Sequence, residues 1–433
     1  MKRKIIAELV AWKNKKNRMP LIVNGARQVG KTYALEVFAK ENFDNVVYLN
    51  MEIETPLRTF LDGDISPKRI IQHLELTKKQ PIIAEKTLIF FDEIQACERA
   101  LTSLKYFCEQ APEYYVVAAG SLLGVAVNRE KYSFPVGKVN ELQMFPLDFE
   151  EFLWAMGYDG LANEIKNHFE SNEPMNKALH QLALELYKKY LIVGGMPAVV
   201  KNFIETNSFL SAALIQNDIF NEYTADMSKY ADTTTSVKIR ACYNSIPAQL
   251  AKENRKFQYK IVQKGGTATI FGESIEWLNF AGTVLKCQKI TEGTLPIVAY
   301  QYFPDFKLYM SDVGLLTLKS RLPAELLVAE ENEGNTFMGV VSENYVAQAF
   351  SANKIPLFYW KNDNTAEVDF VIQQGVNVVP VEVKRGVNTR SKSLNMFVKQ
   401  YKCSYAIRVS QKNFGFENGI KSVPFYAVFC IKE

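Results

Sequence analysis

The feature that most constrains the fold of this chain is a glycine-rich segment near its N-terminus. Residues 20–40 read as a short apolar run, a glycine loop and a helical pattern, and the loop fits GxxxxGK[ST] in the strand–loop–helix context that this motif needs. The loop consists of Gly25, Ala26, Arg27, Gln28, Val29, Gly30, Lys31 and Thr32. Backbone N–H groups of such a loop surround phosphate oxygens, and the following helix adds its N-terminal dipole. The segment therefore predicts a nucleotide-binding α/β domain with a parallel sheet.

Specific side chains of this region have predicted roles in ATP chemistry. Lys31 would reach the β- and γ-phosphates, and Thr32 would be a ligand of Mg²⁺. A strand is predicted over residues 87–91, and Asp92 and Glu93 follow it. Because a buried strand carries such carboxylates to the sheet edge where a nucleotide binds, we expect Asp92 to hold Mg²⁺ through water. Glu93 would orient or deprotonate the attacking water.

A further apolar strand, predicted over residues 114–119, ends in Gly120 and Ser121. An ATPase of the additional-strand (ASCE) class places a polar sensor of the γ-phosphate at this point. Ser121 is therefore a candidate catalytic residue. A Gly-Ser turn without any role in catalysis explains the same pattern equally well.

Four segments together carry a family resemblance: GARQVGKT, LIFFDEIQ, AAGS and FPLDFEEF. They resemble the AAA+ ATPases of a bacterial and archaeal ATP-binding family whose C-terminal half is a domain of unknown function, DUF4143. Members often carry Gly-Arg-Val before the Pro-Leu segment, where this chain has Lys138. Lys138 and Arg129 are both candidates for a cation acting in trans within a homo-oligomer, but a lysine lacks the forked geometry of an arginine for phosphate. The resemblance implies an ATPase domain over residues 1–155.

The middle of the chain is expected to be helical, with a lid and connector over residues 156–235. A Gly-Gly-Met-Pro turn at residues 194–197 resembles a turn of the same family and has a predicted structural role. Asp218, Glu222 and Asp226 are spaced to share one helical face. Three such carboxylates could gather a cation, but a solvated acidic face is the favoured interpretation.

Residues 236–325 are expected to form a winged-helix-like region. Two helices, over 237–250 and 269–280, precede strand-like residues 283–290, an order found in winged helices that read DNA. The second helix carries Glu273 and Glu276 but no Lys or Arg, so a structural winged helix is at least as well supported as a DNA reader. Asp312 is predicted to cap an apolar helix.

Residues 326–433 are predicted to form an α/β domain that resembles the PD-(D/E)xK nuclease fold, which the resemblance to the family also implies. A helix over residues 339–350 would carry Glu343, and strands would carry Asp369, Glu382 and Lys384. The three carboxylates are predicted to bind Mg²⁺ or Mn²⁺, and Lys384 to orient water or offset developing charge in catalysis. The alternative is a cross-strand salt bridge in a binding module that does not cleave.

Charge is distributed unevenly along the chain. The 51 Lys and Arg residues against 47 Asp and Glu residues leave a net charge of only +4. Residues 383–402 nevertheless hold six basic residues and no acidic one: Lys384, Arg385, Arg390, Lys392, Lys399 and Lys402. Such a segment neutralises phosphates, so DNA is a candidate partner. The expected function is ATP hydrolysis coupled to DNA binding or metal-dependent DNA processing; the alternative is an ATP-dependent switch that binds protein or nucleic acid without cleaving it.

Composition argues against several other classes of protein. His73, His168 and His180 are far apart and the six cysteines form no CxxC motif, so a zinc site or a disulfide scaffold is not expected. The apolar run over residues 116–127 is shorter than the roughly 20 residues that cross a bilayer. Glu8 interrupts the N-terminal apolar segment, which argues against a signal peptide. We therefore expect a cytoplasmic protein without a membrane partner.

Overall fold

The N-terminal part of the molecule is built on a parallel sheet. The computed structural model describes residues 1–121, 135–229, 233–328, 337–362, 366–385 and 392–433. The sheet has the order β2-β3-β4-β1-β5, and every neighbouring pair in it is parallel. Its strands are β1 (Leu21–Asn24), β2 (Asn45–Asn50), β3 (Thr87–Asp92), β4 (Tyr115–Ala119) and β5 (Asn140–Gln143). The predicted α/β fold with a parallel sheet is therefore confirmed.

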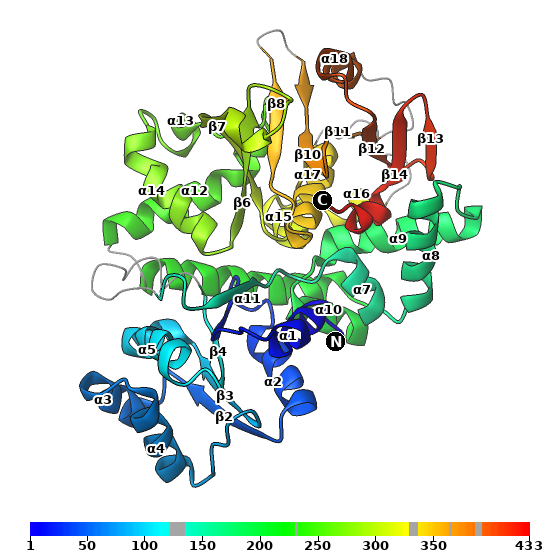
Figure 1. Cartoon of the computed structure of the whole chain (residues 1–433). Helices are drawn as coiled ribbons and strands as arrows, with labels where there is room; N and C mark the ends of the chain where they lie inside the picture. The colour runs from blue at the N-terminus through cyan, green and yellow to red at the C-terminus, as the bar shows by residue number, and fades with distance from the viewer. Residues whose placement is uncertain (122–134, 230–232, 329–336, 363–365, 386–391) are drawn as a thin grey trace.

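Helices cover both faces of this sheet because successive side chains of each strand point to opposite sides. In β3, Leu88 and Phe90 pack in one hydrophobic core, whereas Ile89 and Phe91 pack in another. The first core includes residues of two helices of this domain, together with residues of many later helices, and the second includes residues of three helices (Figure 1). The two helices are α1 (Ile5–Lys13) and α2 (Lys31–Asn42), and the three are α3 (Thr55–Gly63), α4 (Pro67–Lys78) and α5 (Glu98–Gln110). A 3-10 turn, η1 (Ile94–Ala96), follows β3.

The middle of the chain is helical, as expected. It contains α7 (Phe149–Ala155), α8 (Asp159–Ser171), α9 (Lys177–Val193), α10 (Pro197–Thr206) and α11 (Phe209–Lys229). α7 begins with a capping box formed by Asp148 and Glu151, which satisfies two backbone N–H groups at once. α11 crosses the middle of the molecule, between the parallel sheet and the C-terminal sheets (Figure 1).

The Gly-Gly turn between α9 and α10 is held by a distant carboxylate. Gly195 N donates to Asp312 Oδ2 at 2.6 Å, and Leu315 N donates to Asp312 Oδ1 at 3.0 Å. A Cβ atom on Gly194 would lie 2.2 Å from Asp312 Oδ1, so only glycine fits beside this side chain. Asp312 is the N-cap of α15 (Val313–Lys319), which confirms the predicted cap and shows that it also fixes the turn.

The region after α11 joins the C-terminal region through a shared sheet. Its elements are α12 (Thr233–Leu250), α13 (Tyr259–Val262), α14 (Ala268–Phe280), β6 (Val284–Ile290), η2 (Ile297–Tyr300), β7 (Gln301–Met310) and α16 (Ala324–Val328). β6 and β7 form an antiparallel hairpin, and β6 also pairs in parallel with β8 (Phe358–Lys361). The sheet order is β7-β6-β8-β9, so strands from both sides of residue 325 share one sheet.

The C-terminal region surrounds a buried helix. In α17 (Phe337–Ala352) every residue from Val340 to Phe350 is buried. The second sheet has the order β10-β11-β12-β14-β13, in which β10 and β11 are antiparallel and β11 and β12 are parallel. The remaining elements are β9 (Glu367–Val368), β10 (Phe370–Gln374), β11 (Asn377–Val383), α18 (Lys392–Tyr401), β12 (Ala406–Ser410), β13 (Gly415–Glu417), β14 (Ile420–Pro424) and η3 (Phe425–Cys430). None of the helices in the described ranges is long and apolar enough to cross a membrane.

Candidate active site

The glycine loop lies between β1 and α2, as predicted. Gly25 and Gly30 have positive φ angles of 154° and 92°, and a Cβ atom on Gly25 would lie 2.3 Å from the carbonyl oxygen of Met144. Glycine at both positions is therefore required by backbone conformation or by close packing. Gly30 is the N-cap of α2, so the first N–H groups of this helix face the loop.

Lys31 lies inside the loop. Its Nζ donates to the carbonyl oxygens of Gly25 at 3.0 Å and Ala26 at 2.9 Å, and the side chain is buried. Burial lowers the pKa of Lys31 to about 8, although the nearby carboxylates of Glu93 and Asp92 act to raise it. A buried ammonium with few polar partners is well suited to a phosphate group that restores its lost solvation.

The predicted Mg²⁺ ligands are brought together at the edge of the sheet. Thr32 Oγ1 donates to Asp92 Oδ2 at 2.9 Å, and Tyr48 OH donates to the same oxygen at 2.9 Å. Burial and the charge of Asp92 raise the pKa of Tyr48 to about 12, so the phenol stays a donor. Sequence reasoning missed Tyr48, because nothing in its local sequence distinguishes it from an ordinary strand residue.

Glu93 is held beside these residues by a second polar side chain that the sequence analysis missed. Gln95 Nε2 donates to Glu93 Oε2. The oxygen of the same Gln95 amide packs on the end of β4, where a Cβ atom on Gly120 would lie 2.5 Å from Gln95 Oε1. Ser121, the predicted sensor, follows Gly120 and is buried. The residue pattern DEIQ was the available signal for Gln95.

The acidic face of α11 contacts the phosphate loop. Arg27 NH1 lies 2.5 Å from Asp226 Oδ1, and Arg27 Nε lies 3.8 Å from Glu222 Oε2. Gln28 Nε2 also donates to Glu222, and Tyr223 OH donates to the carbonyl oxygen of Arg27 at 3.1 Å. The expectation of a solvated acidic face is therefore wrong for Asp226, which is buried against the loop, whereas Glu222 contacts the loop and stays half-exposed.

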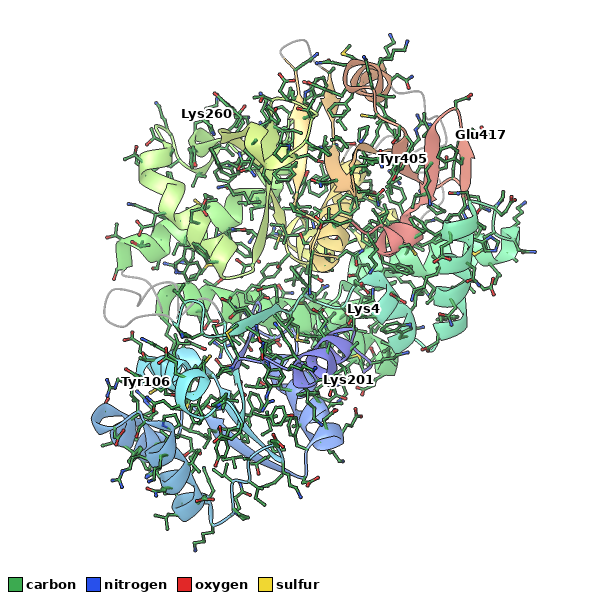
Figure 2. All side chains as sticks on the ribbon, in the orientation of Figure 1. Lys4, Tyr106, Lys201, Lys260, Tyr405 and Glu417 are labelled. Atoms are coloured by element: carbon green, nitrogen blue, oxygen red, sulfur yellow. The ribbon has the colours of Figure 1, made fainter. Side chains whose placement is uncertain are left out.

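A cavity of about 550 Å³ lies beside Gly30 of the loop. Its lining includes Gly30, Tyr33, Pro197 and Lys201. Lys201 and Lys4 both lie near the junction between the parallel sheet and the rest of the molecule (Figure 2). The cavity is therefore formed jointly by the start of α2 and by the helix that follows the Gly-Gly turn.

Of the two candidates for a trans-acting cation, only Lys138 lies in the part of the chain that the structure describes. Lys138 Nζ forms an exposed ion pair with Glu109 Oε1 at 3.0 Å. Arg129 lies outside the described residues. Neither observation tests a role in a neighbouring subunit.

In the C-terminal region, Asp369 lies next to β11, the strand that carries Glu382. Asp369 Oδ2 accepts from Val383 N at 2.8 Å, which places it beside the strand that carries Glu382. The carboxylate of Glu382 lies 3.4 Å from Lys384 Nζ and 3.8 Å from Arg408 Nε. Arg408 was not predicted, because it comes from β12, a later strand that pairs with β11.

Glu343 does not join these two carboxylates in a metal cluster. It is fully buried, and it pairs with Lys307 Nζ at 3.0 Å and with Arg255, and accepts from Tyr309 OH. Among the described residues, no group of three or more His, Cys, Asp or Glu side chains is arranged to hold a metal ion. The predicted ligand set of Glu343, Asp369 and Glu382 is therefore corrected, since two cations and a phenol already occupy the Glu343 carboxylate.

Residues 17–153 match the family model for an AAA domain, AAA_14. The N-terminal part of this chain is an AAA domain. Residues 184–325 match a domain of unknown function, DUF8612, and residues 338–428 match DUF4143. The predicted AAA and DUF4143 resemblance is confirmed, and the AAA domain contains the loop and the Asp92–Glu93 pair.

Similarity to solved structures is distant. The chain is similar to the Walker-type ATPase PABY2304 of Pyrococcus abyssi at 14% identity, covering 73% of this chain and 95% of that one, with a TM-score of 0.44. It is similar to the ORC2 protein of Aeropyrum pernix in its ADPNP–ADP complexes at 14% identity, covering 80% and 95%, with a TM-score of 0.36. A RuvB protein of Thermotoga maritima follows at 14% identity, 65% and 86% coverage, and a TM-score of 0.30. No curated protein matches the chain significantly.

Proposed function

We propose that this protein binds ATP together with Mg²⁺ at the loop of its AAA domain and hydrolyses it. The observation that carries the proposal is the contact between Thr32 and Asp92 at 2.9 Å, with Glu93 and Lys31 beside it. Oxygen donors of this kind are the ligands that Mg²⁺ prefers. When bound, Mg²⁺ would neutralise charge on the phosphate oxygens.

Each residue of the site has its own proposed role in ATP hydrolysis. The loop N–H groups and the start of α2 would bind the phosphates, and Lys31 would contact the β- and γ-oxygens. Glu93 would take a proton from the attacking water, with Gln95 holding its carboxylate in place. Ser121 would contact the γ-phosphate from the end of β4. The cavity beside Gly30 has a size suited to the base and ribose.

Nucleotide binding provides the first test of this proposal. Binding of a fluorescent ATP analogue and steady-state ATP turnover would be measured for the wild-type chain and for Lys31→Ala, with Mg²⁺ and with EDTA. We expect Lys31→Ala and EDTA each to abolish turnover. Wild-type chain that binds no nucleotide, or Lys31→Ala that turns over ATP normally, would refute the proposal.

We further propose that the C-terminal region binds DNA, so that the protein is an ATP-dependent switch on nucleic acid. The support is a surface of basic residues beside Glu382. Lys392, Lys399 and Lys402 are exposed on or next to α18, and Lys384 is half-exposed. Arg390 lies outside the described residues.

Salt dependence tests the proposed DNA surface. Affinity for a DNA duplex would be measured between low and high salt for the wild type and for Lys392→Ala/Lys399→Ala/Lys402→Ala. We expect the triple variant to bind more weakly and to have a shallower salt dependence, by up to about one unit of slope for each phosphate that the variant no longer neutralises. The matched control replaces the exposed Lys40, Lys68 and Lys105 of the AAA domain with Ala. Equally weakened binding in both triple variants would contradict a specific surface.

Metal-dependent cleavage is a second candidate function, favoured by one observation. Asp369 accepts a hydrogen bond from the backbone of Val383, between Glu382 and Lys384, and this sequence order resembles that of the PD-(D/E)xK pattern. Single- and double-stranded DNA and RNA would be incubated with Mg²⁺ or Mn²⁺ and wild type, Asp369→Ala or Lys384→Ala. Cleavage by the wild type alone supports a nuclease; equal cleavage by all three indicates contamination, and no cleavage supports binding alone.

A further inference from the structure

The third residue of the phosphate loop carries a cation that is turned toward α11. Arg27 NH1 lies 2.5 Å from Asp226 Oδ1, and Glu222 approaches the guanidinium from the preceding turn of the same helix at 3.8 Å. The Arg27 side chain is one-third exposed (34%), whereas that of Asp226 is almost completely buried (5%). The pair therefore lies at the edge of the nucleotide site, where the arginine is partly exposed and the aspartate is buried.

The charge of Arg27 interacts with the charges of Glu93 and Lys31, which would act on the γ-phosphate. Burial acts to lower the pKa of Arg27, but the carboxylates of Asp226, Glu93 and Glu222 outweigh burial and raise it. Arg27 also acts on Lys31, whose pKa it lowers. The charge of Glu93 acts to raise the pKa of Arg27, and the charge of Arg27 acts to lower the pKa of Lys31. The three groups therefore share one electrostatic environment. A triphosphate bound to Lys31 would therefore attract Arg27 as well.

Asp226 is poorly satisfied, which argues that it does not serve stability alone. Oδ2 is buried and has no hydrogen-bond partner among the described residues. Burial raises the pKa of Asp226, and the attraction of Arg27 offsets only part of this increase. Buried carboxylates with an unpaired oxygen are costly, so the position of Asp226 calls for an explanation beyond its ion pair with Arg27.

We propose that Arg27 acts in cis on the γ-phosphate and that Asp226 and Glu222 restrain it until ATP is bound. The proposal rests on the proposed ATPase function and deepens it. In the reaction the water oxygen forms a bond to the γ-phosphorus, and the bond from that phosphorus to ADP breaks with its electron pair passing to ADP. Glu93 takes the proton from water. Arg27 offsets the charge that develops on the γ-phosphate oxygens, as arginines supplied in cis or in trans do elsewhere.

The restraint links the site to the rest of the chain, because α11 is also packed on other elements. Gln216 Nε2 of α11 donates to the carbonyl oxygens of Ile192 and Val193 at the end of α9. One turn further along α11, Phe220 packs against Tyr243 of α12, with ring centroids 6.2 Å apart. Transfer of Arg27 from α11 to a phosphate therefore breaks its ion pairs with both Asp226 and Glu222, which hold the loop to a helix shared with the C-terminal half.

Kinetics of single and double variants test the proposal. We expect Arg27→Ala to lower kcat about 10³-fold or more, by analogy with the removal of an arginine finger, while ATP affinity changes little. Arg27→Lys should keep only a small part of the wild-type kcat, because an ammonium lacks the forked donor geometry of a guanidinium. Asp226→Asn and Glu222→Gln should raise kcat or tighten the binding of a non-hydrolysable ATP analogue relative to ADP. Asp218→Asn, an exposed acid on the same helix, is the matched control.

The double variant Arg27→Ala/Asp226→Asn separates restraint from a structural effect. If Asp226 acts through Arg27, the double variant has the kcat of Arg27→Ala. Arg27→Ala with wild-type kcat overturns the proposal, as does an Asp226→Asn variant that folds and shows no increase in either kcat or ATP-analogue affinity. Should Asp226→Asn fail to fold, the half-exposed Glu222→Gln decides the same point. Lys31→Ala run in parallel distinguishes these outcomes from failure of the ATPase function itself, in which wild type and Lys31→Ala would turn over ATP equally.

Discussion

At the scale of single residues, the nucleotide site is built from charged groups that have few partners until a ligand arrives. Lys31 is buried against two carbonyl oxygens, and Glu93 depends on one amide, that of Gln95. Because each group is held by so few hydrogen bonds, single substitutions should change its chemistry without disturbing the sheet.

The lowered pKa of Lys31 predicts proton uptake on nucleotide binding. In the free chain its pKa is about 8, and a bound triphosphate raises it by favouring the ammonium. At pH 7 Lys31 is mostly protonated both in the free chain and in the nucleotide-bound chain, so nucleotide binding takes up few protons. Above pH 8 the free chain is neutral at this position, binding takes up a proton, and ATP affinity falls by up to about tenfold per pH unit.

Calorimetry in two buffers with different ionisation enthalpies checks this linkage. The heats of ATP binding should agree at pH 7 and diverge at pH 8.5. Lys31→Arg, which stays charged at both pH values, should show no divergence at either. Identical heats for the wild type at pH 8.5 would contradict the lowered pKa.

Gln95 is predicted to position the catalytic carboxylate. Gln95→Ala removes the donor to Glu93 and should lower kcat about tenfold or more, because the base loses its orientation, while ATP affinity stays unchanged. Gln110→Ala, an exposed glutamine at the end of α5, serves as the control in the same turnover and binding assays. An ATP affinity that falls in parallel with kcat would instead indicate general damage to the site.

At the scale of elements, the Gly-Gly turn between α9 and α10 couples three segments. Gly195 donates to Asp312, and a Cβ atom on Gly195 would lie 2.0 Å from the carbonyl oxygen of Leu147. Leu147 N in turn donates to Gly195 O at 2.7 Å. The turn is therefore fixed from both sides, and it sets the position of Pro197 beside the phosphate loop.

Gly195→Ala should destabilise the fold, because neither backbone can move away cheaply. We expect a decrease of at least about 2 kcal/mol in the free energy of unfolding, measured by chemical denaturation. Gly272→Ala in α14, where a Cβ atom would meet nothing within 4 Å, should be neutral or stabilising by up to about 1 kcal/mol. Similar effects of the two substitutions would mean that the turn is not closely packed.

Elements and site residues could be predicted where a short sequence motif marks them. The loop residues, Asp92 and Glu93 follow from a motif and from the rule that parallel strands end at one edge, and the pairing of Thr32 with Asp92 is its direct result. The roles of Glu222 and Asp226 could not be predicted, since they depend on packing between segments about two hundred positions apart. Glu343 was misassigned for the same reason: its partners Lys307 and Arg255 come from the preceding region.

At the scale of the whole molecule, the AAA domain and the C-terminal half are joined by more than the chain itself. α11 contacts the phosphate loop and packs on α12, and β6 pairs with β8 across the predicted boundary at residue 325. Arg3 near the N-terminus donates to the carbonyl oxygens of Val29 in the loop and Phe145 before α7. The phosphate loop is therefore in contact with α11, which packs on α12, and with Arg3, which also reaches the segment before α7.

The central claim is that ATP is hydrolysed at this loop with Glu93 as the base, and turnover by Glu93→Gln tests it most directly. The ATPase rate and the nucleotide retained after gel filtration would be measured for wild type, Glu93→Gln and the exposed control Glu113→Gln. We predict that Glu93→Gln loses about 10²–10⁴-fold in kcat while it retains bound nucleotide, and that Glu113→Gln behaves as wild type. A Glu93→Gln variant that hydrolyses ATP at the wild-type rate would contradict the account.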